Sequence, residues 1–294
     1  MNYTFIILAP PYTSKSSGVR ALYRLCHHLN ESGYSAAIRA EREERASDWN
    51  VHFHRGAVGD SIVIYPEIVS GNPLQAGKVV RWALNDPGLL AGDTTYPDEE
   101  MVFVYDPQKL ETVSRAVSKP LGPKRVLWTG LVDPDVIYPD ASVPKTIDCS
   151  FTHKGRALRE RFPLPPGLVI ETLEDRTPDM AALGDTLRRT RTLYSYDHYS
   201  NVLREAAISG CDIRVISEEG VWHDPRGCSC QKNILWQDKL VENYAHKFRD
   251  SSFTHDFVRE VRTRWPVPNA RPSGKKNRSF WRALWPRRWN QSGN

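Results

Sequence analysis

Hydrophobic residues in the first half of the chain form short runs, separated by segments rich in Gly, Pro, Asn and Asp. Between the first two runs, residues 16–33 place apolar side chains at helical spacing, with Ser16 or Ser17 suited to cap a helix and Gly33 suited to end it. Short strands that alternate with helices are typical of a parallel α/β sheet. The strand-like runs lie at 3–9, 35–39, 61–65, 78–84, 101–105 and 125–130.

The pattern stops at 131–145, a stretch rich in Pro and Asp that is typical of a linker, and then starts again. Strand-like runs follow at 146–156, 168–175, 192–197 and 212–217, with helical patterns at 178–190 and 200–210 and two more helices within 232–264. We therefore predict two α/β domains, at 1–138 and 139–250, followed by a closing helix at 251–270 and a basic aromatic tail at 271–294.

The composition is that of an ordinary globular protein, with 294 residues, 40% of them hydrophobic and 26% charged. The apolar run at 5–11 is shorter than a signal-peptide core, and no run approaches the roughly 20 residues of a membrane span. The five cysteines are scattered and odd in number, which favours free thiols in a reducing compartment. We therefore expect a cytoplasmic protein.

Residues 192–216 carry the pattern that bears most directly on function. They predict a strand, a short polar turn, a helix that begins near Ser200, a terminating Gly210 and a second strand. The amino end of a helix presents free N–H groups and a partial positive charge, which suits a diphosphate. Ser200 and Asn201 are residues of the capping type and can add side-chain contacts there.

Within this segment Asp197 and Glu205 stand eight positions apart, and Ala206, Gly210 and an apolar strand follow them. The segment resembles the nucleotide-sugar-binding unit of glycosyltransferases of the GT-B fold, in particular the retaining bacterial enzymes similar to glycosyltransferase family 4. The resemblance implies an α/β, GT-B architecture, in which two Rossmann-like domains face each other across a cleft. It also implies that Glu205 binds the ribose of the donor and that Asp197 lies near the transferred sugar.

Two residues depart from the pattern of these enzymes. Asp197 stands where a Glu is usual, and Asp212 stands where a Pro is usual. The choice between retaining and inverting transfer therefore stays open.

The resemblance also implies cations and a glycine around the donor. Lys154 and Arg156 follow the first strand of the second domain, where this group of enzymes places a pair that binds the diphosphate; Lys and Arg both suit phosphate. Gly18, in the loop before the first helix, removes a side chain that would keep a ligand from the backbone. Each of these motifs is also compatible with an ordinary surface or helix-start loop.

Inverting transfer would need a carboxylate that accepts the proton of the acceptor hydroxyl. Glu67 and Asp86 lie in polar loops after two strands of the first domain and are candidates for this base, although Asn85-Asp86-Pro87-Gly88 is equally compatible with ordinary turn chemistry. Cys228 and Cys230 lack a second ligand pair at zinc spacing. We expect no metal and no other cofactor, with the nucleotide sugar acting as co-substrate.

The positive net charge of the chain comes from its last 24 residues, the tail at 271–294. Residues 271–294 hold seven Lys and Arg and no acid, so the formal charge of +5 becomes −2 for residues 1–270. Trp281, Trp285 and Trp289 recur every four residues beside Phe280, with Arg between them. This pattern favours a peripheral contact with an anionic membrane surface, on the inner face of the membrane. Nucleic-acid binding is the less favoured reading, and a terminus without a partner is the third.

We therefore expect a glycosyltransferase that moves a sugar from a nucleotide-sugar donor to a cell-surface glycan or a lipid-linked acceptor, as in polysaccharide biosynthesis. Two alternatives stay open. One is a transferase that acts on modified DNA bases, and the other is a non-catalytic protein that binds a nucleotide or a glycan.

Overall fold

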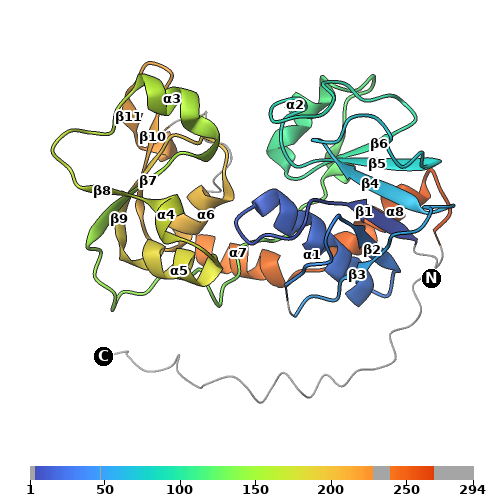
Figure 1. Ribbon diagram of the computed structural model, residues 1–294, viewed down its shortest axis with the longest axis horizontal. Helices are drawn as coiled ribbons and strands as arrows, with labels where there is room; N and C mark the ends of the chain where they lie inside the picture. Colours follow the sequence, from blue (N-terminus) through green and yellow to red (C-terminus); the bar gives the residue numbers. More distant parts are fainter. Residues whose placement is uncertain (1–3, 47, 228–238, 268–294) are drawn as a thin grey trace, which may run out of the picture.

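The computed structural model describes residues 4–46, 48–227 and 239–267, and these form two α/β units around two sheets (Figure 1). The predicted α/β class is confirmed. The first sheet is entirely parallel, in the order β3-β2-β1-β4-β5-β6. Its strands are β1 (Phe5–Leu8), β2 (Ala36–Arg39), β3 (His52–Phe53), β4 (Ile62–Pro66), β5 (Lys78–Ala83) and β6 (Met101–Val104).

The second sheet has the order β11-β10-β9-β7-β8, in which only β11 runs antiparallel to its neighbour. An antiparallel edge on an otherwise parallel sheet is common in α/β proteins. Its strands are β7 (Ile147–Phe151), β8 (Ile170–Thr172), β9 (Thr190–Ser195), β10 (Asp212–Ile216) and β11 (Trp222–His223).

Helices cover the sheets unevenly. The longest described helix is α1 (Ser17–Glu31), which packs on the first sheet, while α5 (Met180–Arg189) precedes β9 and α6 (Asn201–Ile208) connects β9 with β10. None of the helices in the described ranges is long and apolar enough to cross a membrane. The remaining helices are α2 (Leu110–Ser114), α3 (Arg156–Arg161), α4 (Leu173–Arg176), α7 (Leu240–Arg249) and α8 (Phe253–Arg262), with 3-10 turns at Pro107–Lys109, Pro123–Arg125, His153–Gly155 and Pro225–Gly227.

Two of the predicted strands differ from the structure. The run at 125–130 forms only an isolated bridge, between Val104 and Val126, because the 3-10 turn that starts at Pro123 takes up its beginning. The run at 168–175 is a strand only at β8 and then becomes α4. Glu174 and Asp175 lie in the first turn of this helix, where acidic side chains favour a helix start.

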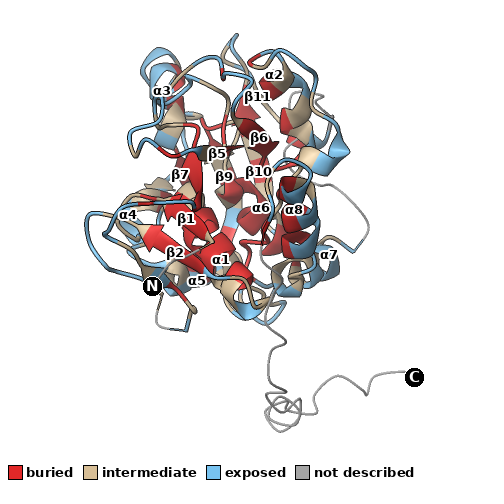
Figure 2. Ribbon diagram, turned by 90° about the vertical axis from the view of Figure 1, so that its right-hand side faces the viewer, coloured by how far each residue is buried: buried red, intermediate tan, exposed pale blue. Residues whose placement is uncertain are grey.

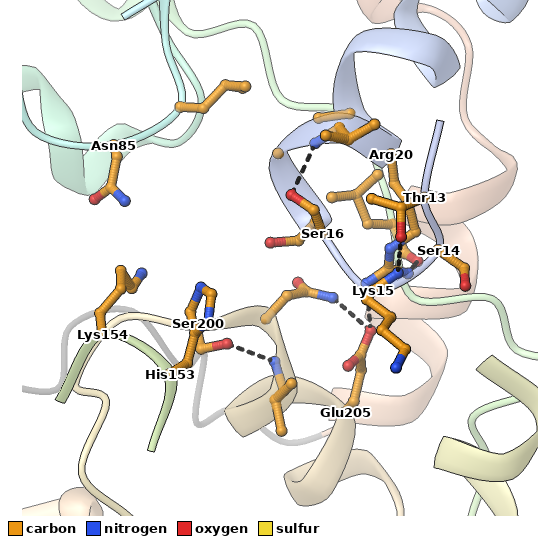
Figure 3. Close-up of a pocket in the computed structure, with 18 of the residues that line it drawn as sticks. Thr13, Ser14, Lys15, Ser16, Arg20, Asn85, His153, Lys154, Ser200 and Glu205 are labelled. Carbon is orange, nitrogen blue, oxygen red and sulfur yellow. Dashed lines mark hydrogen bonds and ion pairs between the residues drawn. The ribbon is translucent and has the colours of Figure 1, made fainter. Parts of the chain in front are cut away.

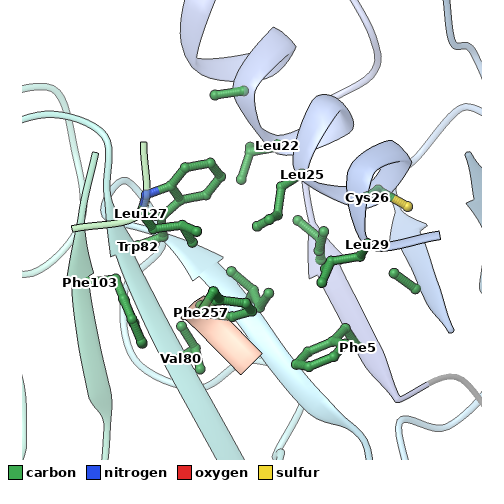
Figure 4. Close-up of a cluster of buried hydrophobic side chains, with 14 of the residues drawn as sticks. Phe5, Leu22, Leu25, Cys26, Leu29, Val80, Trp82, Phe103, Leu127 and Phe257 are labelled. Atoms are coloured by element: carbon green, nitrogen blue, oxygen red, sulfur yellow. The ribbon is translucent and has the colours of Figure 1, made fainter. Parts of the chain in front are cut away.

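Apolar side chains from both faces of the first sheet are buried, and the larger cluster lies between the sheet, α1 and α8 (Figures 2 and 4). Leu22, Leu25 and Leu29 of α1 meet Phe257 of α8 and Trp82 of β5, and each of these side chains is at most 2% exposed. Helix α8 therefore completes the core of the first unit although it lies at the other end of the chain.

The chain crosses between the two units twice. Leu131 packs in the core of the first unit and Val132 in that of the second, so the first crossing lies inside the expected linker. The second crossing lies between Tyr244 of α7, which belongs to the second core, and Phe253 of α8, which belongs to the first. Figure 1 shows α7 beneath both units, leading into α8.

The strand orders fix where a ligand can approach. In each sheet the chain leaves the first strand toward one edge and later returns to continue on its other side, between β1 and β4 and between β7 and β9. Ligands of open α/β sheets bind outside the carboxyl ends of the strands at such switch points. The residues that follow β1, β4, β7 and β9 are therefore the first place to look for a site.

Candidate functional site

A cavity of about 440 Å³ lies between the two units, and both contribute to its walls. The lining residues follow β1 and β4 in the first sheet and β7 and β9 in the second, so both switch points open into the same space. Its volume falls in the range of roughly 300–1,000 Å³ that is typical of small-molecule sites. Figure 3 shows polar groups from both units directed toward it.

The start of α6 forms one wall. Ser200 is the N-cap and its hydroxyl accepts a hydrogen bond from the Val202 amide at 3.3 Å, while no acidic residue occupies the first turn. Asn201 and Glu205 lie one turn apart, and the Asn201 amide donates to Oε1 of Glu205 at 2.8 Å. The local sequence thus brings a helix start and a carboxylate to the same point, as predicted for 192–216.

Glu205 is completely buried and pairs with Arg20 of α1, which belongs to the other unit. Arg20 Nη2 donates to Glu205 Oε1 at 3.0 Å, and Nη1 donates to the carbonyl of Leu131 at 3.2 Å. The second oxygen, Oε2, has no hydrogen-bond partner among the described residues, and neither does Arg20 Nε. A buried carboxylate oxygen without a partner is costly, so a hydroxyl or amide of a ligand would satisfy it.

Lys154 reaches the cavity from the loop after β7. Its ammonium donates to the carbonyl oxygen of Tyr199 and lies 3.6 Å from Oδ1 of Asp197. Burial lowers the pKa of Lys154 and raises the pKa of Asp197, although the attraction between the two opposes both shifts. Oδ2 of Asp197 has no partner in the described structure, so this pair, like the first, is only partly satisfied.

Two further features fix the loop after β7. Gly155 packs so closely that a Cβ there would collide with the carbonyl of Tyr196, which locks this loop to the one after β9. Glu174 of α4 accepts hydrogen bonds from the amides of Thr152 and His153, at 2.8 and 3.1 Å. The two loops that carry Lys154 and Ser200 therefore form one rigid wall.

The start of α1 faces this wall from the first unit. Ser16 is the N-cap and accepts from the Val19 amide at 3.3 Å, and again no acid lies in the first turn. Gly18 lines the cavity, and a Cβ there would meet only Leu84 and Ser16 at ordinary distances. Neighbouring protein atoms therefore do not require glycine at position 18. Lys15, which also lines the cavity, adds a positive charge beside it.

The ends of β4 and β5 form an apolar wall with one carboxylate. Glu67 is 3% exposed, lines the cavity and accepts a hydrogen bond from the Leu84 amide at 2.9 Å. Burial raises the pKa of Glu67, and the backbone N–H groups around it limit the rise. Asn85 follows at the end of β5 and, in Figure 3, lies across the cavity from Lys154.

A second buried ion pair joins the units beside the cavity. Arg204 of α6 pairs with Asp106 at 2.9 Å, and the Tyr199 hydroxyl donates to the same oxygen at 3.1 Å. The ammonium of Lys109 lies 3.8 Å from the centre of the Tyr199 ring. Tyr199 is therefore inserted between the units, directly before the start of α6.

The structure brings six of the predicted residues to the cavity and leaves three outside its lining. Asp86 pairs with Lys109 at 2.7 Å, Arg156 is exposed at the start of α3, and Asp197 stands behind Lys154. The six that line the cavity are Gly18, Glu67, Lys154, Ser200, Asn201 and Glu205.

Sequence reasoning missed Arg20, Tyr199, Arg204 and Asp106. Their importance arises from contacts with the other unit, such as the pair between Arg20 and Glu205, 185 positions apart. The only sequence signal for burial of Arg20 is its position between the apolar residues Val19 and Ala21 on α1.

No cluster of three His, Cys, Asp or Glu side chains suited to a metal occurs in the part of the chain that the structure describes. Cys228, Cys230 and the tail with Phe280, Trp281, Trp285 and Trp289 lie outside the described residues.

No known protein family matches the chain, and no curated protein matches it in sequence.

Proposed function

We propose that the protein is a glycosyltransferase of the GT-B type that binds a nucleotide-sugar donor in the cavity between its units. One observation carries the proposal: Glu205, Ser200 and Asn201 at the start of α6 share a cavity with Lys154, at the switch points of two α/β sheets. A nucleoside diphosphate has complementary groups, since it carries ribose hydroxyls next to two phosphates.

The roles follow from the chemistry of each group. The starts of α6 and α1, together with Lys154 and Lys15, supply positive potential for the diphosphate and for the charge that grows on it as the sugar leaves. The free Oε2 of Glu205 accepts a hydrogen bond from a ribose hydroxyl. No residue here has to form a covalent bond with the donor, so catalysis consists mainly of positioning and electrostatic stabilisation.

Thermal unfolding of the full chain with nucleoside diphosphates, nucleotide sugars and inorganic diphosphate tests this proposal. A ligand at about 100 times its Kd stabilises the folded state by roughly 2.7 kcal/mol, which is several degrees in Tm for a protein of this size. We expect at least one nucleoside diphosphate to shift Tm more than inorganic diphosphate does. The difference measures the contribution of the ribose and base.

Glu205→Gln should remove that difference and keep the response to inorganic diphosphate, because the amide can still bond Arg20 but no longer presents a carboxylate to ribose. Asp106→Asn is the matched control, since it weakens the other buried pair between the units without altering a residue of the cavity lining. Equal loss in both variants would make Glu205 a structural residue. If no nucleotide compound shifts Tm, the proposal fails.

Lys154→Ala should weaken the response to inorganic diphosphate itself, with the exposed Lys119→Ala as its control. Release of nucleotide from the bound donor then distinguishes a transferase from a protein that only binds. Binding without any release, with water or a sugar acceptor, would favour the non-catalytic alternative.

A further inference from the structure

Two exposed leucines stand together at the mouth of the cavity, on the wall of the first unit. Leu89 and Leu90 are each 56% exposed, and Leu90 also lines the cavity. Ile68 and Leu84 continue the apolar surface inward from Leu90. Single exposed apolar residues are common, but a group of them that continues into a cavity indicates a contact with a ligand or partner.

The loop that carries these leucines is held in place by the segment that carries Glu67. Gly92 has φ +83° and lies so close to the chain that a Cβ would collide with the carbonyl of Glu67. Asp93 accepts a hydrogen bond from the Gly71 amide at 2.7 Å. The leucines are therefore presented in a fixed position beside Glu67.

Two parts of the cavity differ in chemistry. The part of the cavity between the starts of α6 and α1 carries Lys154 and Lys15, which suit the diphosphate, whereas the part formed by the ends of β4 and β5 is apolar around Glu67 and Asn85. With the diphosphate of the donor in the charged part, the apolar part is left for the second substrate. That substrate needs an apolar portion to cover the leucines and a hydroxyl near Glu67.

We propose that the surface formed by Ile68, Leu84, Leu89 and Leu90 binds an acceptor with an aliphatic segment next to its reacting hydroxyl, and that Glu67 accepts the proton of that hydroxyl. The proposal rests on the proposed function. The hydroxyl oxygen forms a bond to the anomeric carbon as its proton passes to Glu67. The bond from that carbon to the phosphate oxygen breaks, and the nucleoside diphosphate leaves with the electron pair.

Binding of methyl and octyl β-D-glucoside, each below any micelle concentration and with nucleoside diphosphate present, tests the apolar surface. Burial of only two methylene groups is enough for roughly tenfold tighter binding, so octyl glucoside should bind at least about tenfold more tightly to the unmodified protein. The double variant Leu89→Ser, Leu90→Ser should reduce this advantage to about threefold or less. Leu168→Ser with Val169→Ser is the control, because these residues are 45% and 89% exposed but do not line the cavity.

Equal affinity of the two glucosides for the unmodified protein would overturn the acceptor assignment. So would an equal loss of the octyl advantage in the control variant.

Glu67→Gln tests the base. Loss of a general base lowers the rate by roughly 10²–10⁴. We expect the rate of nucleotide release from the donor, with water or a glucoside as acceptor, to fall by at least about 100-fold, while the Tm shift caused by the donor is retained. The acidic limb of the pH profile, which reports protonation of the base, should disappear in Glu67→Gln and persist in the exposed Glu99→Gln.

Retained turnover in Glu67→Gln would overturn the role of Glu67 and leave donor binding in place. Absence of a Tm shift with any nucleotide compound would instead contradict the proposed function. The two failures are therefore distinct.

Discussion

The two buried ion pairs that join the units look alike but differ in how their carboxylates are satisfied. Arg204–Asp106 and Arg20–Glu205 are 2.9 and 3.0 Å long, and all four side chains are at most 8% exposed. Asp106 uses both oxygens, since Oδ2 accepts from Arg204 and Tyr199 and Oδ1 accepts from the Gln108 amide. Glu205 uses only Oε1, which accepts from Arg20 and Asn201.

This difference separates a structural contact from a binding group. A buried polar network that is fully satisfied fixes one arrangement of the chain, whereas an unsatisfied atom costs free energy that a ligand can recover. The pair at Asp106 therefore holds the units together, and the pair at Glu205 holds them together while reserving one oxygen for a ligand. The following changes compare the buried Asp106 network with other contacts of the two units, from the largest expected effect on stability to the smallest.

Asp106→Ala should lower the free energy of unfolding by about 3–5 kcal/mol, because it removes the buried carboxylate that pairs with Arg204 and accepts from Tyr199. Urea unfolding of the protein without ligand measures this loss. Asp60→Ala is the control: Asp60 pairs with Lys78 at 2.6 Å but its side chain is 94% exposed, and such pairs contribute at most about 1 kcal/mol. Similar losses in the two variants would show that the pair at Asp106 does not hold the units together.

Acidification should destabilise the first unit itself, at the point where His28 of α1 packs against Phe253 of α8. Burial, assisted by the charge of Arg24, lowers the pKa of His28 to about 3. As the pH falls below about 6.5, His28 binds a proton in the unfolded chain but not in the folded protein. The free energy of unfolding is therefore highest above that pH and decreases as the pH drops toward 3. Between pH 7.5 and 5 this loss amounts to about 2 kcal/mol.

His28→Gln should remove that part of the pH dependence, as measured by urea unfolding at both pH values. The exposed His246→Gln should keep it. An unchanged pH dependence in His28→Gln would mean that the histidine is accessible to protons in the folded state. The charged and titratable groups that act on this histidine are Arg24, His27, Lys247 and Asp250.

Tyr199→Phe should cost about 1–2 kcal/mol, because it removes one hydrogen bond from the buried carboxylate of Asp106 and keeps the ring against Lys109. The control is Tyr34→Phe, whose hydroxyl bonds His255 at an exposed position. Combining Tyr199→Phe with Asp106→Asn should give less than the sum of the two losses. Strict additivity would contradict a shared network.

The smallest effects should come from the caps of the helices that carry the two pairs. Ser200→Ala and Ser16→Ala each remove an N-cap acceptor and should cost about 1 kcal/mol, whereas Ser200→Gly should cost only a few tenths. Equal losses for Ala and Gly at Ser200 would indicate that the hydroxyl acts through a contact other than the cap. Thermal unfolding without ligand is sufficient to rank the three variants.

Most of the sheet structure could be predicted because it follows from local apolar runs. β1, β4, β5 and β6 are short runs of almost entirely buried residues, and short apolar runs bounded by turn residues are typical of buried strands. β3 and β11 are only two residues long, and their pairing depends on neighbours brought by the fold. The same is true of α8: a helix was predicted in this segment, but its position on the first sheet depends on the complete fold.

The residues of the candidate site also fall into two groups, those that local sequence signals indicate and those that only the complete fold specifies. Ser200 and Asn201 were found because a helix start is encoded within a few residues, whereas Glu205 was singled out by the resemblance of residues 192–216 to a nucleotide-sugar-binding unit. Asp86 could not be separated from Glu67, because the sequence does not reveal that Lys109 pairs with Asp86. Partners that come from distant segments decide which carboxylate faces a ligand, and they are specified only by the complete fold.

The double crossing of the chain, at Leu131 and again before Phe253, has a mechanical consequence. Two connections limit how far the units can move apart, because both segments would have to extend. When the ion pairs separate, their partners remain tethered at a high effective concentration, so they re-form without encountering another molecule. Any separation of the two units would therefore be a unimolecular step whose rate does not depend on protein concentration.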